Sequence, residues 1–328
     1  MRLTPGLRSV FAVGLLAVAG LAPSASHAAE PWPTRTVRLI VPFPAGSAND
    51  AAARLYAEGL SKRWAKPVVV DNRAGADASI GTGAFANARD DHTLLYSTAS
   101  TITVNPLLQD SLPYDPAKDL TPIGAGASAT LVVAVHAQLP VQSLQDLTSL
   151  ASAKPGTLNW GSGPSLPYFV FAALVKRRGF DMIYIPYRDA TSAAADLGEG
   201  RVHVLSHALQ AVTPPLKQGK ARIIAVMSSQ REPTLPDVPT VVEAGFPEME
   251  MEGLSGLFGW RDMSPELRDR LSADMQAVAQ DPELRARIVA SGQRALGSTA
   301  ADFAAAIERQ RLRVREIAQI IDVKNPTR

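Results

Sequence analysis

The chain has 328 residues, of which 46% are hydrophobic and 20% charged, as in a globular protein large enough for two domains. It contains no cysteine, which excludes disulfides, thiol catalysis and zinc–thiolate sites. Its formal charge is only +2 and no run of like charges occurs, so nucleic acid is not an expected partner.

The N-terminus predicts a secretory signal peptide over residues 1–28. Arg2 and Arg8 precede the apolar run 10–21, and small residues follow it. A run of about 12 apolar residues is too short to span a bilayer. Cleavage between Ala28 and Ala29 would leave a periplasmic mature chain with equal numbers of acidic and basic residues.

Apolar runs rich in β-branched residues then alternate with helical patterns. The expected strands are 36–43, 67–72 and 92–98, and the expected helices are 51–64 and 80–88. Such alternation predicts a parallel sheet with right-handed crossovers.

A long strand expected over 123–135 leaves this unit, after which the alternation restarts. The second unit is predicted to contain strands 157–162, 181–187, 201–209 and 221–229 and helices 144–153, 167–179, 191–200 and 213–219. Prolines exclude a long regular element from 231–248. A strand over 249–260 is expected to cross back.

The remainder is predicted to be helical, with helices that start at Ser264, Asp281 and Thr299. The fold class is therefore α/β, with two lobes, each a mostly parallel sheet flanked by helices, and two crossing segments as the hinge. Domain 1 is expected to comprise 29–128 and 252–328, and domain 2 to comprise 129–251. Ligands of such folds bind between the lobes, at the carboxyl ends of the strands.

Small polar residues follow three consecutive strands of the first unit. Gly46, Ser47 and Asn49 follow the first strand, Gly75 and Ser79 the second, and 97–101 the third. A helix N-terminus offers free N–H groups and partial positive charge, which suit a carboxylate. Each segment alone is equally well explained as a plain strand-to-helix turn, but three at one sheet edge indicate a shared rim.

The matching strand ends of the second unit carry Ser162, Gly163, Ser165 and Tyr187. Arg188 there is either a ligand group or a solvated surface group. His203 and His207 lie four residues apart and lack the third ligand of a metal site. They are either partly buried with ordinary partners, or His207 faces the ligand. In the second case, anion binding should weaken as pH rises through roughly 6.5.

Catalytic motifs are missing from the sequence. Residues 253–257 read GLSGL, in which Leu257 replaces the second glycine of a nucleophile elbow. Neither a phosphate-binding loop nor a dinucleotide-binding glycine pattern is present. We therefore expect no enzymatic activity and no cofactor.

A set of segments in fixed order gives the sequence a specific resemblance. They are VPFPAGSAND at 41–50, NRAGADASIGT at 72–82, TVNPLLQDSLPYDPAKDLTPI at 103–123, KPGTLNW at 154–160, DMIYIPYRDATSAAADL at 181–197 and LPDVPTVVEAGFP at 235–247. The chain resembles, over essentially its whole mature length, the periplasmic receptors of tripartite tricarboxylate transporters, also called Bug receptors.

This resemblance implies a two-lobed periplasmic-binding-protein (flytrap) fold that closes on a small carboxylate, partly through ordered waters. It also implies delivery to the large and small integral subunits of a membrane transporter, and we expect a monomer. By motif, the implied ligand-binding positions are Phe43, Pro44, Ala45, Gly46, Ser47, Asn49, Gly75, Ala76, Ala78, Ser79, Ala99, Ser100, Thr101, Ser162, Gly163, Ser165 and Tyr187.

The sequence departs from the family pattern at several of these loops. Ala45 and Ala74 replace prolines, Ser47 and Asp77 replace glycines, and His207 replaces a common acidic residue. The turn after Gly163 is shorter than usual. The ligand therefore stays open among dicarboxylates, tricarboxylates, acidic amino acids and aromatic carboxylates. A sensory receptor for a sensor kinase, or a secreted hydrolase or lyase that uses the same cleft, are the alternatives.

Overall fold

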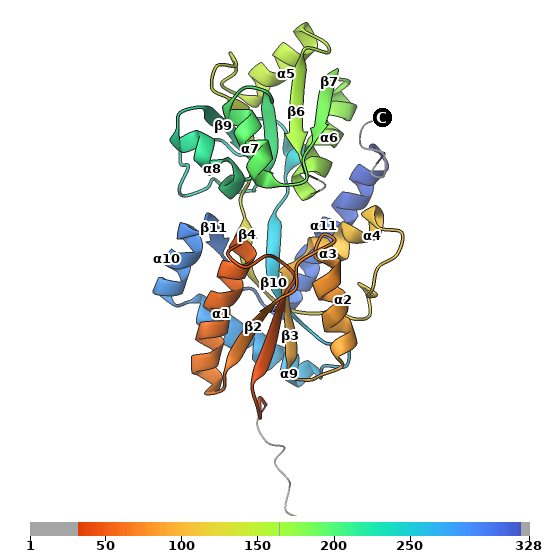
Figure 1. Cartoon of the computed structure of the whole chain (residues 1–328), viewed down its shortest axis with the longest axis vertical. Coiled ribbons are helices and arrows are strands. Elements are labelled where there is room, and N and C mark those ends of the chain that lie inside the picture. Colours follow the sequence, from red (N-terminus) through yellow and green to blue (C-terminus); the bar gives the residue numbers. More distant parts are fainter. Residues whose placement is uncertain (1–31, 164, 323–328) are drawn as a thin grey trace, which may run out of the picture.

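Two β-sheets, each covered by helices on both faces, divide the chain into two lobes (Figure 1). The computed structural model describes residues 32–163 and 165–322, so the expected signal peptide lies outside the described residues. The first sheet has the order β11-β4-β10-β3-β1-β2 and the second β7-β6-β8-β5-β9. These sheets confirm the predicted two-lobed α/β class.

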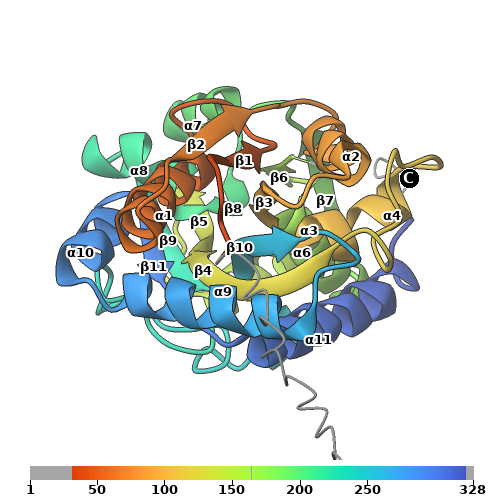
Figure 2. The ribbon, with the colours of Figure 1, turned by 90° about the horizontal axis from the view of Figure 1, so that it is seen from below.

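The first lobe is built on six strands. They are β1 (Val37–Val41), β2 (Val68–Asn72), β3 (Thr93–Thr98), β4 (Thr121–Ala129), β10 (Gly253–Gly259) and β11 (Gln293–Ala295). Its helices are α1 (Ala48–Trp64), α2 (Ser79–Ala88), α3 (Ser100–Thr103), α4 (Asn105–Leu108), α9 (Pro265–Ala279), α10 (Pro282–Ala290) and α11 (Ala300–Ala318). Seen from below, α1 and α2 lie on opposite sides of β1 and β3 (Figure 2).

The second lobe is built on five strands. They are β5 (Leu131–His136), β6 (Leu158–Ser162), β7 (Met182–Pro186), β8 (Val204–Ala208) and β9 (Ala221–Val226). Its helices are α5 (Leu144–Ala153), α6 (Leu166–Arg178), α7 (Ala190–Gly198) and α8 (Leu209–Lys217), with a 3-10 turn η1 (Pro247–Met249). Helices α5 and α6 pack on one face of this sheet, and α7 and α8 pack on the other.

Only part of each sheet is parallel, which corrects the prediction of mostly parallel sheets. In the first lobe β1 runs parallel to β2 and β3, and in the second β6 runs parallel to β7 and β8. The pairings of β10, β11 and β5 with their neighbours are antiparallel. The parallel half is the half that carries the predicted ligand loops.

Both lobes place a topological switch point beside these loops. The first strand of each parallel unit, β1 or β6, lies between the second and third strands of that unit. The loop that follows β1 or β6 therefore turns away from the loop that follows the third strand of the unit, β3 or β8. This divergence leaves a crevice at the carboxyl ends of the strands. The carboxyl ends of β1, β2 and β3 point toward the second lobe (Figure 1).

The chain passes between the lobes twice in its sheets and once more in its last helix. The strand expected over 123–135 is two strands, β4 and β5, which belong to different sheets and meet at Thr130. The second passage lies between β9 and β10. Helix α11 begins against the first lobe through Phe303 and Ile307. It ends in the core of the second lobe through Val314 and Ile317.

Side-chain caps define the starts of the predicted C-terminal helices. The side chains of Ser264, Asp281 and Thr299 each accept a hydrogen bond from an amide of the first helical turn. Among the described residues, no helix has both the length and the apolar content required to cross a membrane.

Candidate functional site

The first loop joins β1 to α1 and contains six of the predicted residues. Pro44 and Ala45 are exposed, while Phe43, Ser47 and Asn49 are half-buried. Ser47 is the N-cap of α1, since its Oγ accepts from the amide of Asp50 at 3.3 Å. The amides of Ala48 and Asn49 donate no hydrogen bond among the described residues. These two N–H groups are available to an anion.

Asp50 is a site residue that sequence reasoning missed. Its carboxylate is buried and accepts from the amide of Gly46 (2.8 Å), Nδ2 of Asn72 (2.8 Å) and Nε of Arg54 (3.0 Å). The amide of Gly46, which was predicted to face the ligand, is therefore occupied. Burial would raise the pKa of Asp50, but the hydrogen bonds from Arg54 and Asn72 outweigh it and lower the pKa. Asp50 thus holds the first loop as a carboxylate.

The second loop has an unusual backbone. Gly75, Ala76, Asp77 and Ala78 all have positive φ, at 131°, 46°, 50° and 71°. Left-handed backbone costs a residue with a β-carbon roughly 1–2 kcal/mol. Among the described residues, none of these four amides donates a hydrogen bond. A strained loop with four free donors is the kind of backbone outlier that marks a binding site.

Side chains from α4 and its flanks hold the second loop in this shape. Asn105 Nδ2 donates to the carbonyl of Asp77 (2.8 Å) and to Oγ of Ser79 (3.1 Å). Gln109 Nε2 donates to the carbonyl of Ala76 (3.2 Å). The hydroxyl of Ser79, a predicted ligand group, is thus buried in this network. The loop instead offers its backbone to a ligand.

The third loop lies at the end of β3. Ala99 and Thr101 are buried, and Thr101 Oγ1 donates to the carbonyl of Thr98 at 2.8 Å. Ser100 is half-buried and its hydroxyl has no partner among the described residues. Of the three predicted residues, Ser100 alone therefore has a free side-chain hydroxyl.

In the second lobe, three predicted side chains have structural partners. Ser162 is buried and its hydroxyl donates to the carbonyl of Ser206 at 2.9 Å. The hydroxyl of Tyr187 donates to Asp196 Oδ2 at 2.6 Å, and its ring packs in the core beneath α7. Ser165 donates to the carbonyl of Gly163 at 3.2 Å. Their hydroxyls hold the local fold, and a ligand would meet the backbone near Gly163.

His207 lies at the end of β8 and is half-buried. Its Nδ1 accepts from the amide of Ala208 at 2.9 Å, so the neutral ring carries its proton on Nε2. Burial lowers the pKa of His207 below 6.5. The ring is therefore a neutral donor near pH 7, and the predicted loss of an imidazolium through pH 6.5 shifts to lower pH. His203 lies outside the strand and accepts from the amide of Asn159.

A cavity of about 810 Å³ lies between the lobes and contains His207. The first lobe contributes Phe43, Ser47 and Ala48 to its wall. The second lobe contributes residues of α7, the end of β8 and α8, among them Thr191 and Gln210, which sequence reasoning missed. Its size is in the range of small-molecule sites. The cavity unites Phe43, Ser47 and His207 from the predicted set.

Two helix N-termini, one from each lobe, border this cavity. Ala48 begins α1, and Gln210 and Ala211 belong to the first turn of α8. The amides of Gln210 and Ala211 donate no hydrogen bond among the described residues. Both helix ends bring partial positive charge and free N–H groups to one space. An anion bound there would be attracted by both lobes.

The charges of the cavity wall are few. None of its lining residues is Lys or Arg, and its single carboxylate is that of Glu199. Glu199 accepts from Nζ of Lys220 at 2.6 Å, which lowers its pKa. Anion recognition here would depend on N–H groups, hydroxyls and bound water.

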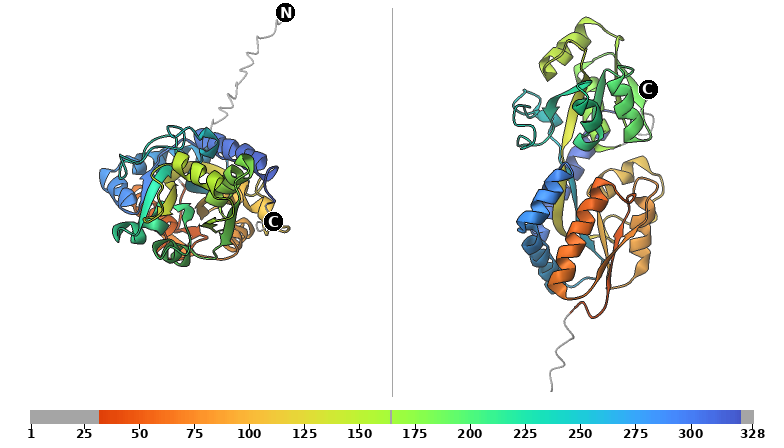
Figure 3. Two further views of the ribbon diagram at one scale, coloured as in Figure 1. Left: turned by 90° about the horizontal axis from the view of Figure 1, so that it is seen from above. Right: turned by 60° about the vertical axis from the view of Figure 1, so that its left-hand side comes forward.

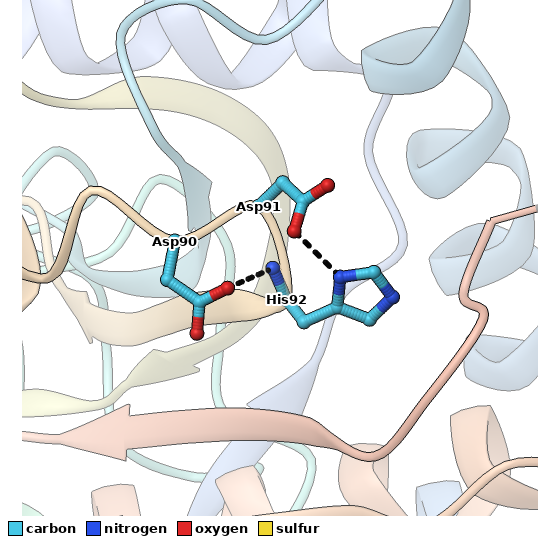
Figure 4. A group of neighbouring side chains, drawn as sticks. All are labelled: Asp90, Asp91 and His92. Carbon is cyan, nitrogen blue, oxygen red and sulfur yellow. Dashed lines mark hydrogen bonds and ion pairs between the residues drawn. The ribbon is translucent and has the colours of Figure 1, made fainter.

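Asp90, Asp91 and His92, between α2 and β3, form a cluster of metal-ligand type (Figure 4). His92 Nδ1 bonds to Asp91 Oδ1 at 2.7 Å, and its Nε2 accepts from the amide of Thr34 at 3.0 Å. Asp90 accepts from Arg35 and from the amide of His92. These bonds fasten the residues before β1 to the start of β3.

Similarity to known proteins identifies the family of this chain. Residues 52–323 match the model of the tripartite tricarboxylate transporter family receptor. The chain is 35% identical over 237 residues to Protein BugT of Bordetella pertussis, which covers 71% of this chain and 72% of BugT.

Two solved structures from Rhodopseudomonas palustris share the fold over nearly their whole length. Rpa4515 with adipate is 30% identical, with a TM-score of 0.76 over 88% of this chain and 98% of that chain. MatC with bound malate is 26% identical, with a TM-score of 0.72 over 87% of this chain and 99% of that chain. By sequence and by structure, this chain belongs to the receptors of the tripartite tricarboxylate transporter family.

Proposed function

We propose that this protein is an extracytoplasmic receptor that captures a small carboxylate between its lobes and delivers it to a membrane transporter. The predicted signal peptide would direct export and would be removed near Ala28. The receptor needs no covalent step and no cofactor for this task.

The observation that carries the proposal is the cavity between the N-termini of α1 and α8. A carboxylate placed there replaces part of its hydration shell with N–H groups from Ala48, Gln210 and Ala211, which line the cavity. The neutral ring of His207 adds one donor, Nε2–H. Because the donors belong to different lobes, a bound carboxylate links them.

Lobe closure follows from this arrangement as a population shift. A ligand that contacts both lobes binds the closed form more tightly, and it shifts the equilibrium by that difference in affinity. The first lobe supplies only three residues to the cavity as it stands, whereas the free amides of the second loop lie on the same sheet edge. Closure would bring that loop to the ligand. The transporter would then recognise the closed form.

The relatives support a carboxylate as the ligand class. Two related structures hold adipate and malate, and both bound molecules are carboxylates. The absence of Lys and Arg from the cavity wall favours recognition through backbone donors and water, as at other helix N-termini.

A thermal-shift screen of carboxylic acids tests the proposal. An acid at about 100 times its dissociation constant should stabilise the protein by roughly 2.7 kcal/mol. The matched amide of each acid serves as the control, because it keeps the shape and lacks the charge. If no mono-, di- or tricarboxylate raises the melting temperature above its amide, the protein is not a carboxylate receptor.

Transport and sensing need a separate experiment in cells. Deletion of the gene should abolish uptake of the labelled acid identified in the screen, and a plasmid copy should restore it. Normal uptake with lost induction of acid-responsive genes would instead identify a sensory receptor.

A further inference from the structure

The second-lobe wall of the cavity includes a trough of small apolar residues between α7 and α8, beside the polar side chains of Thr191, His207, Gln210 and Gln218. This apolar part, called the α7–α8 trough, comprises Ala190, Ala194, Ala195, Ala211, Pro214 and Pro215. These side chains offer no hydrogen bond, and the two prolines also lack an amide proton. The trough therefore suits an apolar group of the ligand, and it is continuous with the anion site at the N-terminus of α8.

The polar groups that border the trough disfavour a second negative charge. Glu199 lines the trough and stays ionised beside Lys220. At the start of α7, the carboxylate of Asp189 accepts from the amide of Ser192 at 2.8 Å and from its hydroxyl at 2.9 Å. This helix end is thus already neutralised by its own residue. A second carboxylate of a ligand in the trough would lie near the ionised Glu199, and no Lys or Arg lines the cavity to pair with it.

Given the proposed carboxylate-receptor function, on which this step rests, we propose that the ligand carries a single carboxylate and an apolar body. The carboxylate lies between the N-termini of α1 and α8, and the apolar body lies in the α7–α8 trough. The receptor thereby differs from the relatives whose structures hold adipate and malate, which each have two carboxylates.

Paired acids of equal carbon skeleton test this inference by calorimetry. Hexanoate and adipate share a six-carbon chain and differ by one carboxylate, and 4-methylbenzoate and terephthalate form a second pair with equal numbers of carbon atoms. The monoacid of at least one pair should bind at least tenfold more tightly than its diacid. Diacids that bind as tightly as the monoacids, or more tightly, would overturn the inference and leave the proposed function intact. If none of the four acids binds, the inference fails, and the wider thermal-shift screen alone decides the proposed function.

Ala195 and Glu199 are exposed residues of the cavity wall, so substitutions at these two positions should retain the fold. Glu199→Gln removes the charge of the wall, so it should shift the monoacid-to-diacid ratio toward the diacid by roughly threefold. Glu308→Gln is the matched control, since Glu308 pairs with Arg311 on α11, far from the cavity. An unchanged ratio in Glu199→Gln would contradict the role of this charge.

Ala195→Glu places a charged chain in the trough at an exposed site of α7. It should weaken hexanoate binding at least tenfold, whereas Ala305→Glu, at an exposed site of α11, should leave it unchanged. Equal hexanoate affinity in the two variants would show that the apolar body lies elsewhere.

Discussion

Asp77 combines left-handed backbone with a negative charge in the second loop, which the proposed closure would bring to the ligand. Its φ is 50°, and the family pattern has glycine at this position. Asp77→Gly should therefore raise the free energy of unfolding by about 1 kcal/mol, because glycine adopts this conformation without strain. The same variant should bind the carboxylate more tightly, since one repulsive charge is removed. Urea unfolding and calorimetry measure the two effects.

Ala65→Gly is the control that separates these effects. Ala65 ends α1 with a φ of 51°, far from the cavity, so its replacement relieves similar strain without a change of charge. It should gain stability and keep its ligand affinity. If both variants gain affinity equally, the charge of Asp77 is not involved in binding.

His207 titrates at lower pH than its sequence position suggests, and it makes the stability of the folded protein depend on pH. Burial lowers its pKa in the folded protein below the unfolded value near 6.5, so the folded state prefers the neutral ring. The stabilisation from this preference is complete above pH 6.5 and is lost as pH falls through the folded pKa. Carboxylate affinity should stay level between pH 7 and 8, because the ring does not change its charge there.

Replacement by asparagine tests this behaviour of His207. The amide oxygen of Asn can still accept from the amide of Ala208, so the strand end should be kept. Denaturant unfolding at pH 7.5 and 5.5 should show a smaller loss of stability in His207→Asn than in the parent protein. His203, whose pKa is also lowered by burial, supplies part of the remaining loss. Equal pH dependence in variant and parent would assign the effect to other groups.

At the level of elements, the first loop and α1 act as one unit through Asp50. Its carboxylate joins the loop at Gly46, the helix at Arg54 and the next strand at Asn72. Asp50→Ala should lower the free energy of unfolding by about 2 kcal/mol, because three hydrogen bonds to a buried carboxylate are lost. It should also weaken carboxylate binding, since the loop is released.

The control for Asp50→Ala is Glu58→Ala on the exposed face of the same helix. Glu58 pairs with Lys62 and Arg287 at the surface, where such pairs add little stability. Its melting temperature and ligand affinity should match those of the parent protein. A stable Asp50→Ala variant with full affinity would show that the network does not shape the loop.

Local signals explain which elements were predictable from the sequence. The caps Ser264, Asp281 and Thr299 predicted their helices because an N-cap is a short-range signal. The strand β11 was missed because its three residues are defined by pairing with β4, which lies far away in the sequence. The break at Thr130 was also missed, since apolar residues continue on both sides and only the change of sheet separates them.

The residues of the site were likewise predictable only where a short-range signal in the sequence marks them. The glycine and serine of the first loop marked a strand-to-helix turn that does border the cavity. The sequence did not reveal that Asp50 occupies the amide of Gly46, or that Tyr187 bonds to Asp196. Such partners are selected by packing, and a side chain with a ligand-like chemical group is often used to hold the fold.

At the scale of the whole molecule, the two lobes are joined by more than the two crossing segments. Helix α11 packs in both lobes, as the side view in Figure 3 and the two core clusters agree. The expected assignment of all of 252–328 to the first domain therefore differs from the structure at the end of this helix. If closure preserves these contacts, the proposed motion of the lobes is restricted to a hinge beside α11.

Hydrogen bonds between the two lobes, beside the cavity, hold the lobes in the arrangement described. Gln210 Nε2 donates to the carbonyls of Gly292 (2.7 Å) and Ser291 (3.1 Å), which belong to the turn between α10 and β11. A β-carbon built on Gly292 would lie 3.0 Å from Cγ of Gln210. Cysteines at these two positions are therefore within reach of a disulfide.

The double variant Gln210→Cys, Gly292→Cys should lock the lobes when it is oxidised. The chain has no cysteine of its own, so the new pair can form only one intramolecular bond. If ligand capture requires the lobes to move, the oxidised protein should bind the carboxylate at least tenfold more weakly, and dithiothreitol should restore the affinity. The reduced double variant and each single variant control for loss of the Gln210 side chain and for the strain of cysteine at a φ of 76°. Oxidised and reduced forms of equal affinity would mean that the cavity already has its binding shape, and lobe closure would then have no part in capture.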